Sequence, residues 1–282
     1  MLRSQSFSLL VPGLLFLSGC AGLPFFQAEK SSYSIEAAQA VAGKPFSYDD
    51  YVTTLSTYVN ANGMVNYEQL QQNRQALDRF NAFLAAVTPE VYEGWSKDEQ
   101  LAYWINAYNS LTLQAIIDQD PLKKSIRDIP GVWNLRQFEI AQGKKTLDNI
   151  EHDTIRKKFN EPRIHAALVC AAMSCPPLRT EPYGADQLDA QLDDQSQKFI
   201  ESPNGLKIDR QANKVYISKI FDWFGDDWKQ AYGIEGKFAG SEKERAVLNF
   251  ISSYVSPEDK TYLEQGNYQV GYLDYDWALN KQ

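Results

Sequence analysis

The apolar run from Ile164 to Ala172 is the feature that most limits how this chain can fold. It follows Pro162 and precedes the segment 174–184, which contains three prolines and is therefore expected to be irregular. A short apolar run between such breaks is typical of a buried strand. The patterns on either side are mainly helical, and helices and strands alternate loosely. We therefore predict a mixed α/β fold, with a small mixed β-sheet surrounded by helices.

Local signals predict the other elements. Ser47-Tyr48-Asp49-Asp50 marks a helix start, apolar groups recur at helical spacing over 67–87, and the capping box Ser96-Lys97-Asp98-Glu99 opens a helix to about Asp118. Further helices are expected over 147–159 (capped by Thr146), 185–201 and 241–254. Short strands are expected over 206–209, 214–218 and 268–277. The domain organisation that follows is a signal peptide at 1–19, a tether at 20–46 with a short helix near 34–41, and one globular domain at 47–282.

Charge and composition exclude several classes of protein. The 282 residues include 28 basic and 36 acidic side chains, which give a formal net charge of −8. An acidic chain of ordinary hydrophobic content is a globular protein rather than a disordered or multi-span membrane protein. Binding to nucleic acid is not expected, because phosphate contacts need clustered lysines and arginines. We predict no cofactor and no bound metal.

The first 20 residues have the pattern of a bacterial lipoprotein signal. A short apolar run, Ser8 to Leu17, follows Arg3 and is too short to span a bilayer. It ends in Leu17-Ser18-Gly19-Cys20, where small residues precede a cysteine that would carry the lipid. Ala21, rather than an aspartate, follows that cysteine, and resemblance to Gram-negative lipoproteins then implies the outer membrane. The alternative is an ordinary secretory signal with a chance cysteine. Acylation of Cys20 would anchor a periplasmic domain to the membrane.

Two cysteines and a histidine form the most unusual cluster, His165-Ala-Ala-Leu-Val-Cys170-Ala-Ala-Met-Ser-Cys175. A nucleophilic thiol needs a base or a positive neighbour, and His165 is one of two histidines that can act on Cys175. On a strand, His165 and Cys170 would point to opposite faces. Cys170 is then a core residue, or it forms a disulfide with Cys175, since envelope thiol pairs tend to oxidise.

Polar side chains on two predicted helices are the other candidates. Glu151 lies on the inward stripe of helix 147–159, where it is expected to orient a histidine or to pair with an arginine such as Arg163. His152 falls on the wetter side, toward Asp148 and Arg156. Asn106 and Asn109, beside Trp104, lie on one helix face and either line a cleft or bind loop backbone inside the core.

The chain resembles the family called domain of unknown function 547. The resemblance rests on Trp104-Ile-Asn-Ala-Tyr-Asn109, Leu147-Asp-Asn-Ile-Glu-His152, and His165 through Cys175-Pro-Pro-Leu178. It continues in Tyr216 to Phe224, which includes Asp222 and Trp223, and in Tyr275 to Asn280. The resemblance implies a shared fold and a site around these polar residues. A further analogy, to papain-like or transglutaminase-like thiol enzymes, implies thiol chemistry, although here His165 precedes Cys175.

Two classes of function follow. In the first, Cys175 of a hydrolase or acyl transferase attacks an amide or peptide carbonyl, and His165 transfers the proton. Glu151, Asn106 or Asp222 then orients the imidazole, and Asn109, Trp104, Asp222 and Trp223 contact a small-molecule or peptide substrate. In the second, Cys170 and Cys175 form a structural disulfide in a binding lipoprotein, whose cleft is walled by Tyr183, Trp223, Trp228 and Trp277. A zinc site at His165, Cys170 and Cys175 fits less well, because the ligand spacings are wide.

Overall fold

A computed structural model of the chain describes residues 33–140 and 143–282. The expected signal peptide at 1–19 and the lipidation residue Cys20 lie outside the described residues. Within the described part, none of the helices is both long enough and apolar enough to cross a bilayer.

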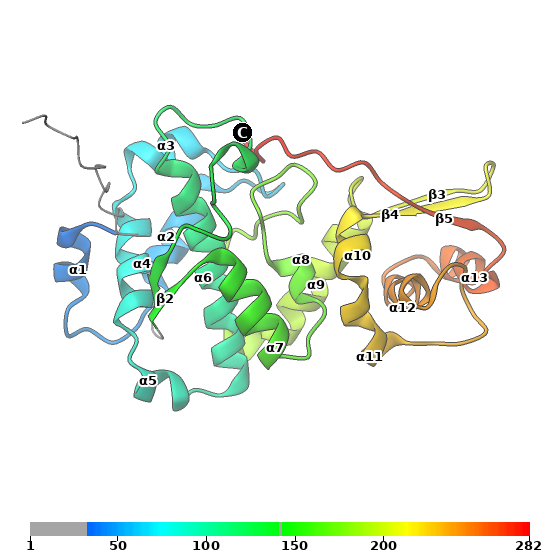
Figure 1. Cartoon of the computed structure of the whole chain (residues 1–282), viewed down its shortest axis with the longest axis horizontal. Helices are drawn as coiled ribbons and strands as arrows, with labels where there is room; N and C mark the ends of the chain where they lie inside the picture. The colour runs from blue at the N-terminus through cyan, green and yellow to red at the C-terminus, as the bar shows by residue number, and fades with distance from the viewer. Residues whose placement is uncertain (1–32, 141–142) are drawn as a thin grey trace, which may run out of the picture. The chain divides into compact units, whose positions relative to one another are not determined.

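The described chain is mainly helical, with two small sheets among the helices, so the predicted mixed α/β fold is confirmed (Figure 1). The helices are α1 (Ile35–Val41), α2 (Asp49–Tyr58), α3 (Tyr67–Gln72), α4 (Gln75–Ala86), α5 (Pro89–Glu93), α6 (Lys97–Ile117), α7 (Arg156–Lys158), α8 (Ile164–Ala167), α9 (Leu188–Glu201), α10 (Lys219–Phe224), α11 (Lys229–Tyr232), α12 (Glu242–Ile251) and α13 (Pro257–Gln265). The short helix expected near 34–41 is α1, which packs against α4.

The strands form a hairpin and a three-stranded sheet. β1 (Phe138–Ile140) and β2 (Gly143–Lys145) are antiparallel, and neither strand was predicted from the sequence. β3 (Leu206–Asp209) pairs antiparallel with β4 (Lys214–Ile217), which pairs parallel with β5 (Gln269–Tyr272). Parallel neighbours need a long crossover, and helices α10 to α13 supply it. The two strands expected near 206 and 214 are confirmed, whereas the third ends at Tyr272 instead of residue 277.

Helix α6 is the centre of the larger core. The predicted capping box is present: the Glu99 N–H donates to the Ser96 hydroxyl, and the Ser96 N–H donates to the Glu99 carboxylate at 2.7 Å. Every residue from Gln100 to Ile117 is buried, so the helix is covered on all sides. The helical pattern at 67–87 is also correct, but it is two helices, α3 and α4, separated by Asn73 and Arg74.

The prediction of a strand over residues 164–172 is wrong. Residues Ile164–Ala167 form the short helix α8, and an irregular segment follows it. The Asn109 side chain supplies the hydrogen bonds that a neighbouring strand would give: its amide donates to the Ala167 carbonyl and accepts from the Val169 N–H, both at 2.9 Å. A short apolar run fits a buried helix end as well as a strand, so its length and hydrophobicity did not distinguish the two.

Two apolar cores meet at α8. Ile164 and Ala167 pack in the larger core around α6, whereas Ala166 packs in a second core formed with β3–β5 and α10–α13. The C-terminal segment, red in Figure 1, returns from β5 toward the larger core. There the Asn280 carbonyl accepts from the Val65 N–H, and the Ala278 carbonyl accepts from the Met173 N–H. The segment after α8 therefore lies between the two apolar cores and contacts the C-terminal segment.

Candidate functional site

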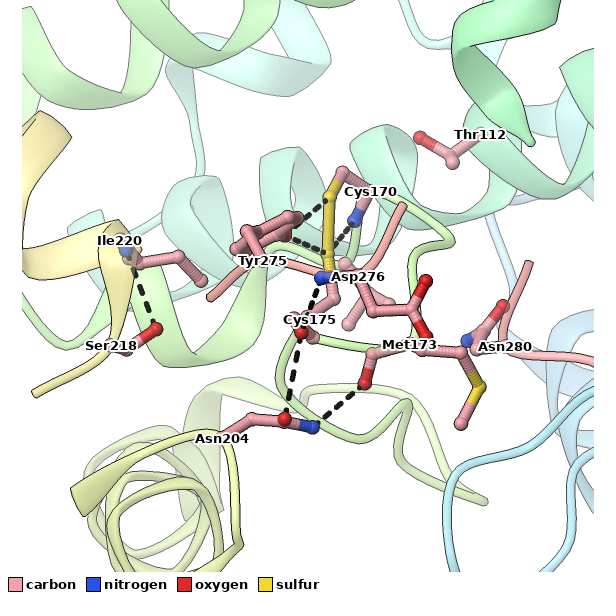
Figure 2. The surroundings of a disulfide bond; sticks show 12 residues. Thr112, Cys170, Met173, Cys175, Asn204, Ser218, Ile220, Tyr275, Asp276 and Asn280 are labelled. Atoms are coloured by element: carbon pink, nitrogen blue, oxygen red, sulfur yellow. Dashed lines mark hydrogen bonds between the residues drawn. A yellow bond between two sulfur atoms is a disulfide. The ribbon is translucent and has the colours of Figure 1, made fainter. Parts of the chain in front are cut away.

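A disulfide joins the two cysteines that follow α8. Cys170 and Cys175 are linked with their Cα atoms 6.2 Å apart, within the usual range for this bond. The Tyr275 hydroxyl lies 3.2 Å from each sulfur, and the Cys170 N–H points at the Cys175 sulfur at 3.1 Å. Figure 2 shows both contacts of Tyr275 with the disulfide. The sulfur that was expected to act as a free nucleophile is therefore oxidised in this structure.

The disulfide loop is fixed by two other parts of the chain. The Asn204 amide donates to the Met173 carbonyl at 2.9 Å (Figure 2). Ser174 and Asp276 exchange two hydrogen bonds: the Asp276 N–H donates to the Ser174 hydroxyl, and the Ser174 N–H donates to the Asp276 carbonyl. The sulfurs therefore have a defined position relative to Tyr275, which lies next to Asp276.

His165 is oriented by a residue that the sequence analysis did not select. Its Nε2 lies 2.8 Å from Asp227 Oδ2, and its ring stacks on Phe224 with centroids 4.4 Å apart. Arg156 donates to both oxygens of the same carboxylate. Burial acts to raise the pKa of Asp227, but the hydrogen bonds from His165 and Arg156 outweigh it and hold that pKa well below its usual value. The ionised Asp227 therefore accepts a hydrogen bond from Nε2–H of His165.

His152 extends this polar network from a different element. It belongs to a π-helical segment, Asn149–Ile155, whose start is capped by a hydrogen bond from the Asn149 N–H to the Thr146 hydroxyl. Arg156 donates to His152 Nδ1 at 3.2 Å, and Asp148 lies 3.9 Å from Nε2. The predicted position of His152 between Asp148 and Arg156 is confirmed, although the helix is π rather than α.

Glu151 points inward, as predicted, but it has different partners from those expected. Arg163 pairs with Glu161 and Asp189 instead. The Glu151 carboxylate interacts with the Tyr108 hydroxyl. Burial, followed by the charge of this carboxylate and the hydrogen bond to it, raises the pKa of Tyr108. Burial and the same charge also raise the pKa of Tyr275. Glu151 is thus a buried anionic centre between two phenols.

These groups surround one cavity of about 210 Å³, which we call the aromatic cleft. Trp223 lies against Trp277 and Tyr275, with ring centroids 5.7 and 4.8 Å away. Trp223 remains 44% exposed, so these rings form an open wall. The cleft is lined by apolar and aromatic side chains, two acidic residues, two histidines and the disulfide: Tyr108, Trp133, Asp148, Glu151, His152, His165, Leu168, Cys170, Cys175, Ile220, Trp223, Phe224, Tyr275 and Trp277.

Four of the expected site residues line the cleft, and four do not. Cys175, His165, Glu151 and Trp223 line it. The other four have partners outside it. Asn106 exchanges two hydrogen bonds with the Tyr183 backbone, and Trp104 is fully buried and donates to the Tyr92 hydroxyl. Asp222 pairs with Lys219 and Lys243. Asn109 does not line the cleft, and its side chain hydrogen-bonds the backbone at Ala167 and Val169.

Several lining residues were missed or only partly recognised. Trp277 was named as a possible cleft wall and does line it, whereas Tyr183 and Trp228 lie outside. Tyr275 belongs to the same C-terminal motif and was not selected. Asp227, which contacts His165 from outside the lining, follows three residues after the Tyr216 to Phe224 motif. The ends of those two motifs are the signals that could have found Tyr275 and Asp227.

Other parts of the described chain offer less chemistry. Within residues 33–140 and 143–282, no three His, Cys, Asp or Glu side chains gather as a metal site would require. Both thiolate ligands of the zinc hypothesis are in the disulfide. A larger hollow of about 490 Å³ is lined by Phe46, Phe83, Trp95 and their neighbours, but by no cysteine or histidine. Its size alone does not make it a better candidate than the aromatic cleft.

Residues 92–200 match the model of a family described as a protein of unknown function, DUF547. This match confirms, for the central part of the chain, the resemblance inferred from the motifs. The matched stretch includes Glu151, His165 and Cys175, whereas Trp223 and Tyr275 lie beyond it. No curated protein and no solved structure matches the chain. The likeness to papain-like or transglutaminase-like enzymes therefore remains an analogy.

Proposed function

We propose that this protein is a lipid-anchored envelope protein whose aromatic cleft binds a small molecule or a short peptide segment. The observation that carries the proposal is the cleft itself, an apolar cavity with a few converging polar groups, which is the usual form of a ligand site. The rings of Trp223 and Trp277 are already stacked in the absence of a ligand. Binding then costs little side-chain ordering.

The envelope location rests on sequence and on redox chemistry. The motif Leu17-Ser18-Gly19-Cys20 supports a lipid anchor at Cys20, and Ala21 after it supports the periplasmic face of the outer membrane. The disulfide between Cys170 and Cys175 is consistent with this proposal, because such bonds persist in oxidising compartments and are rare in the cytosol.

Removal of Trp223 tests the binding proposal. We expect Trp223→Ala to weaken binding of a neutral aromatic probe, benzyl alcohol, by about 30-fold, because central aromatic residues of a site carry about 2 kcal/mol or more. The free energy of unfolding should change by less than about 1 kcal/mol, since the side chain is half-exposed. NMR titration and denaturant unfolding measure the two quantities.

The matched control for this variant is Trp95→Ala, which removes a tryptophan from the larger hollow instead. It should leave benzyl alcohol binding unchanged. Equal binding by wild type and Trp223→Ala, or an equal loss in Trp95→Ala, would show that the aromatic cleft is not the binding site.

The second candidate function is the thiol-dependent hydrolase or acyl transferase. One observation favours it: Cys175 and His165 line the same cleft, and Asp227 orients the imidazole. A dithiol reductant would open the disulfide and become oxidised, which gives the protein two thiols. The Cys175 thiolate then attacks an amide carbonyl, and His165 passes the thiol proton to the leaving amine. Water hydrolyses the resulting thioester and regenerates the thiol.

Mass spectrometry of the full chain made in a Gram-negative host tests the anchor and the redox state together. We expect loss of residues 1–19 and an added lipid mass on Cys20, which Cys20→Ser abolishes. Without reductant, iodoacetamide should modify neither Cys170 nor Cys175, and after a dithiol it should modify both. An unmodified Cys20 would refute the anchor. Alkylation of Cys175 without reductant would favour the hydrolase over the binding protein.

A further inference from the structure

The charge on the lining of the aromatic cleft indicates which ligands it selects, and this inference rests on the binding function proposed above. The acidic side chains on the lining are Asp148 and Glu151, and the described lining holds no lysine or arginine. One ring nitrogen of each histidine is bound to the protein, Nε2 of His165 to Asp227 and Nδ1 of His152 to Arg156. The cleft therefore presents negative charge to a ligand.

Glu151 is a buried acidic residue. It is only 9% exposed, yet it lines the cleft. Its charge acts on the neutral Tyr108 hydroxyl, and the nearest ring nitrogen of His152 is 4.0 Å away. Among the ion pairs of residues 33–140 and 143–282, none joins Glu151 to a lysine or an arginine. The charge of Glu151 helps to raise the pKa of Arg156, but Arg156 is bound to Asp227 rather than to Glu151. Burying a carboxylate without a cation in direct contact is costly, so an ion pair with Glu151 would stabilise a bound cationic ligand.

The aromatic rings of this cleft already attract cations from the protein itself. The Arg127 guanidinium lies over Trp277 at 5.2 Å, and that of Arg156 lies over Phe224 at 5.1 Å. Arg156 is committed to Asp227, and neither arginine is part of the lining. The faces of tryptophan and tyrosine rings favour ammonium groups in the same way. Trp223 and Tyr275, whose centroids are 4.8 Å apart, offer such faces beside the disulfide.

We propose that the aromatic cleft binds a small organic ammonium ion, with the ammonium group at Glu151 and the apolar body against Trp223 and Tyr275. The cavity of about 210 Å³ is smaller than the roughly 300–1,000 Å³ of pockets for drug-sized ligands. It accommodates one ammonium head group with a short apolar body. A free amine would supply such a group. The terminal amine of a longer molecule would also supply it, with the rest of that molecule remaining outside the cleft.

Three probes of similar size and different charge test the proposal with the full chain. Benzylammonium, benzyl alcohol and benzoate share one ring and carry positive, zero and negative charge. We expect benzylammonium to bind about tenfold (about 1.4 kcal/mol) more tightly than benzyl alcohol, because its ammonium group would form a charge-assisted hydrogen bond with Glu151. Benzoate should bind more weakly than either. Glu151→Gln should abolish the preference for benzylammonium over benzyl alcohol, because glutamine is similar in size but carries no charge.

The control is Glu139→Gln, which removes the same charge from β1, outside the cleft lining, and should keep the preference. A thermal unfolding transition like that of the wild type shows that Glu151→Gln is folded. Equal binding of all three probes, or tighter binding of benzoate, would overturn the ammonium proposal while leaving a ligand-binding cleft. If none of the probes binds, both this inference and the proposed binding function fail. Persistence of the preference in Glu151→Gln would show that another group recognises the cation.

Discussion

Replacing Asp227 with asparagine should lower the free energy of unfolding by about 3 kcal/mol at pH 7. Asp227 accepts from the buried His165 and from Arg156, and removing one partner of such a group costs about 3–5 kcal/mol. The lower end applies because the carboxylate is partly exposed. The folded-state pKa lies below the unfolded value, so the stabilisation is complete above about pH 4 and is lost as the pH falls further. Urea unfolding of both proteins across pH 3–7 measures the difference.

Asp222→Asn is the matched control for this variant. Asp222 has a similar exposure but pairs with Lys219 and Lys243, whose ammonium groups can turn toward water when the carboxylate is gone. Its replacement should cost less than about 1 kcal/mol. Equal losses for the two variants, or a loss for Asp227→Asn that stays constant down to pH 3, would contradict the assigned network.

Asn109→Ala should destabilise the protein by about 3 kcal/mol and also weaken ligand binding several-fold. The variant leaves the Ala167 carbonyl and the Val169 N–H without their partner, and each unpaired buried group costs about 1–3 kcal/mol. These two backbone groups lie just before Cys170 in the chain. Without their hydrogen bonds, the position of the disulfide on the cleft lining is less well fixed. Thermal unfolding and benzyl alcohol titration measure the two effects.

Asn106→Ala, in the same helix, is the control that separates an effect on stability from an effect on the shape of the cleft. Asn106 makes the same pair of hydrogen bonds, but to Tyr183, which does not line the cleft. We expect a comparable loss of stability and unchanged affinity for the probe. If both variants lose affinity equally, Asn109 has no particular part in shaping the cleft.

The elements that could be predicted from the sequence are those with strong local signals. The capping box at Ser96 and Glu99 fixes the start of α6 without help from the rest of the fold. The turn after Asn204-Gly205 and the short apolar segments beyond it predicted β3 and β4 correctly. Each of these signals acts within a few residues, so the sequence alone contains enough information.

The predictions from sequence failed where residues far apart in the chain determine the local structure. Residues 164–172 have the composition of a strand, but Asn109, more than fifty positions away, supplies the hydrogen bonds that allow an irregular backbone. Asp227 follows Asp226 in a stretch that resembles a solvated turn, and only the fold brings it to His165. The inward position of Glu151 followed from periodicity, whereas its pairing with Tyr108 required the packing of α6 against the π-helical segment.

The most direct test of the account is an NMR titration of the tryptophan indole N–H signals with benzyl alcohol. The chain has six tryptophans, of which Trp133, Trp223 and Trp277 line the aromatic cleft. Trp95 and Trp104 lie outside its lining. We predict that the three lining signals shift together with a single dissociation constant while those of Trp95 and Trp104 stay in place. A shift of Trp95 alone, or no shift in any signal up to the solubility of the probe, would contradict the account.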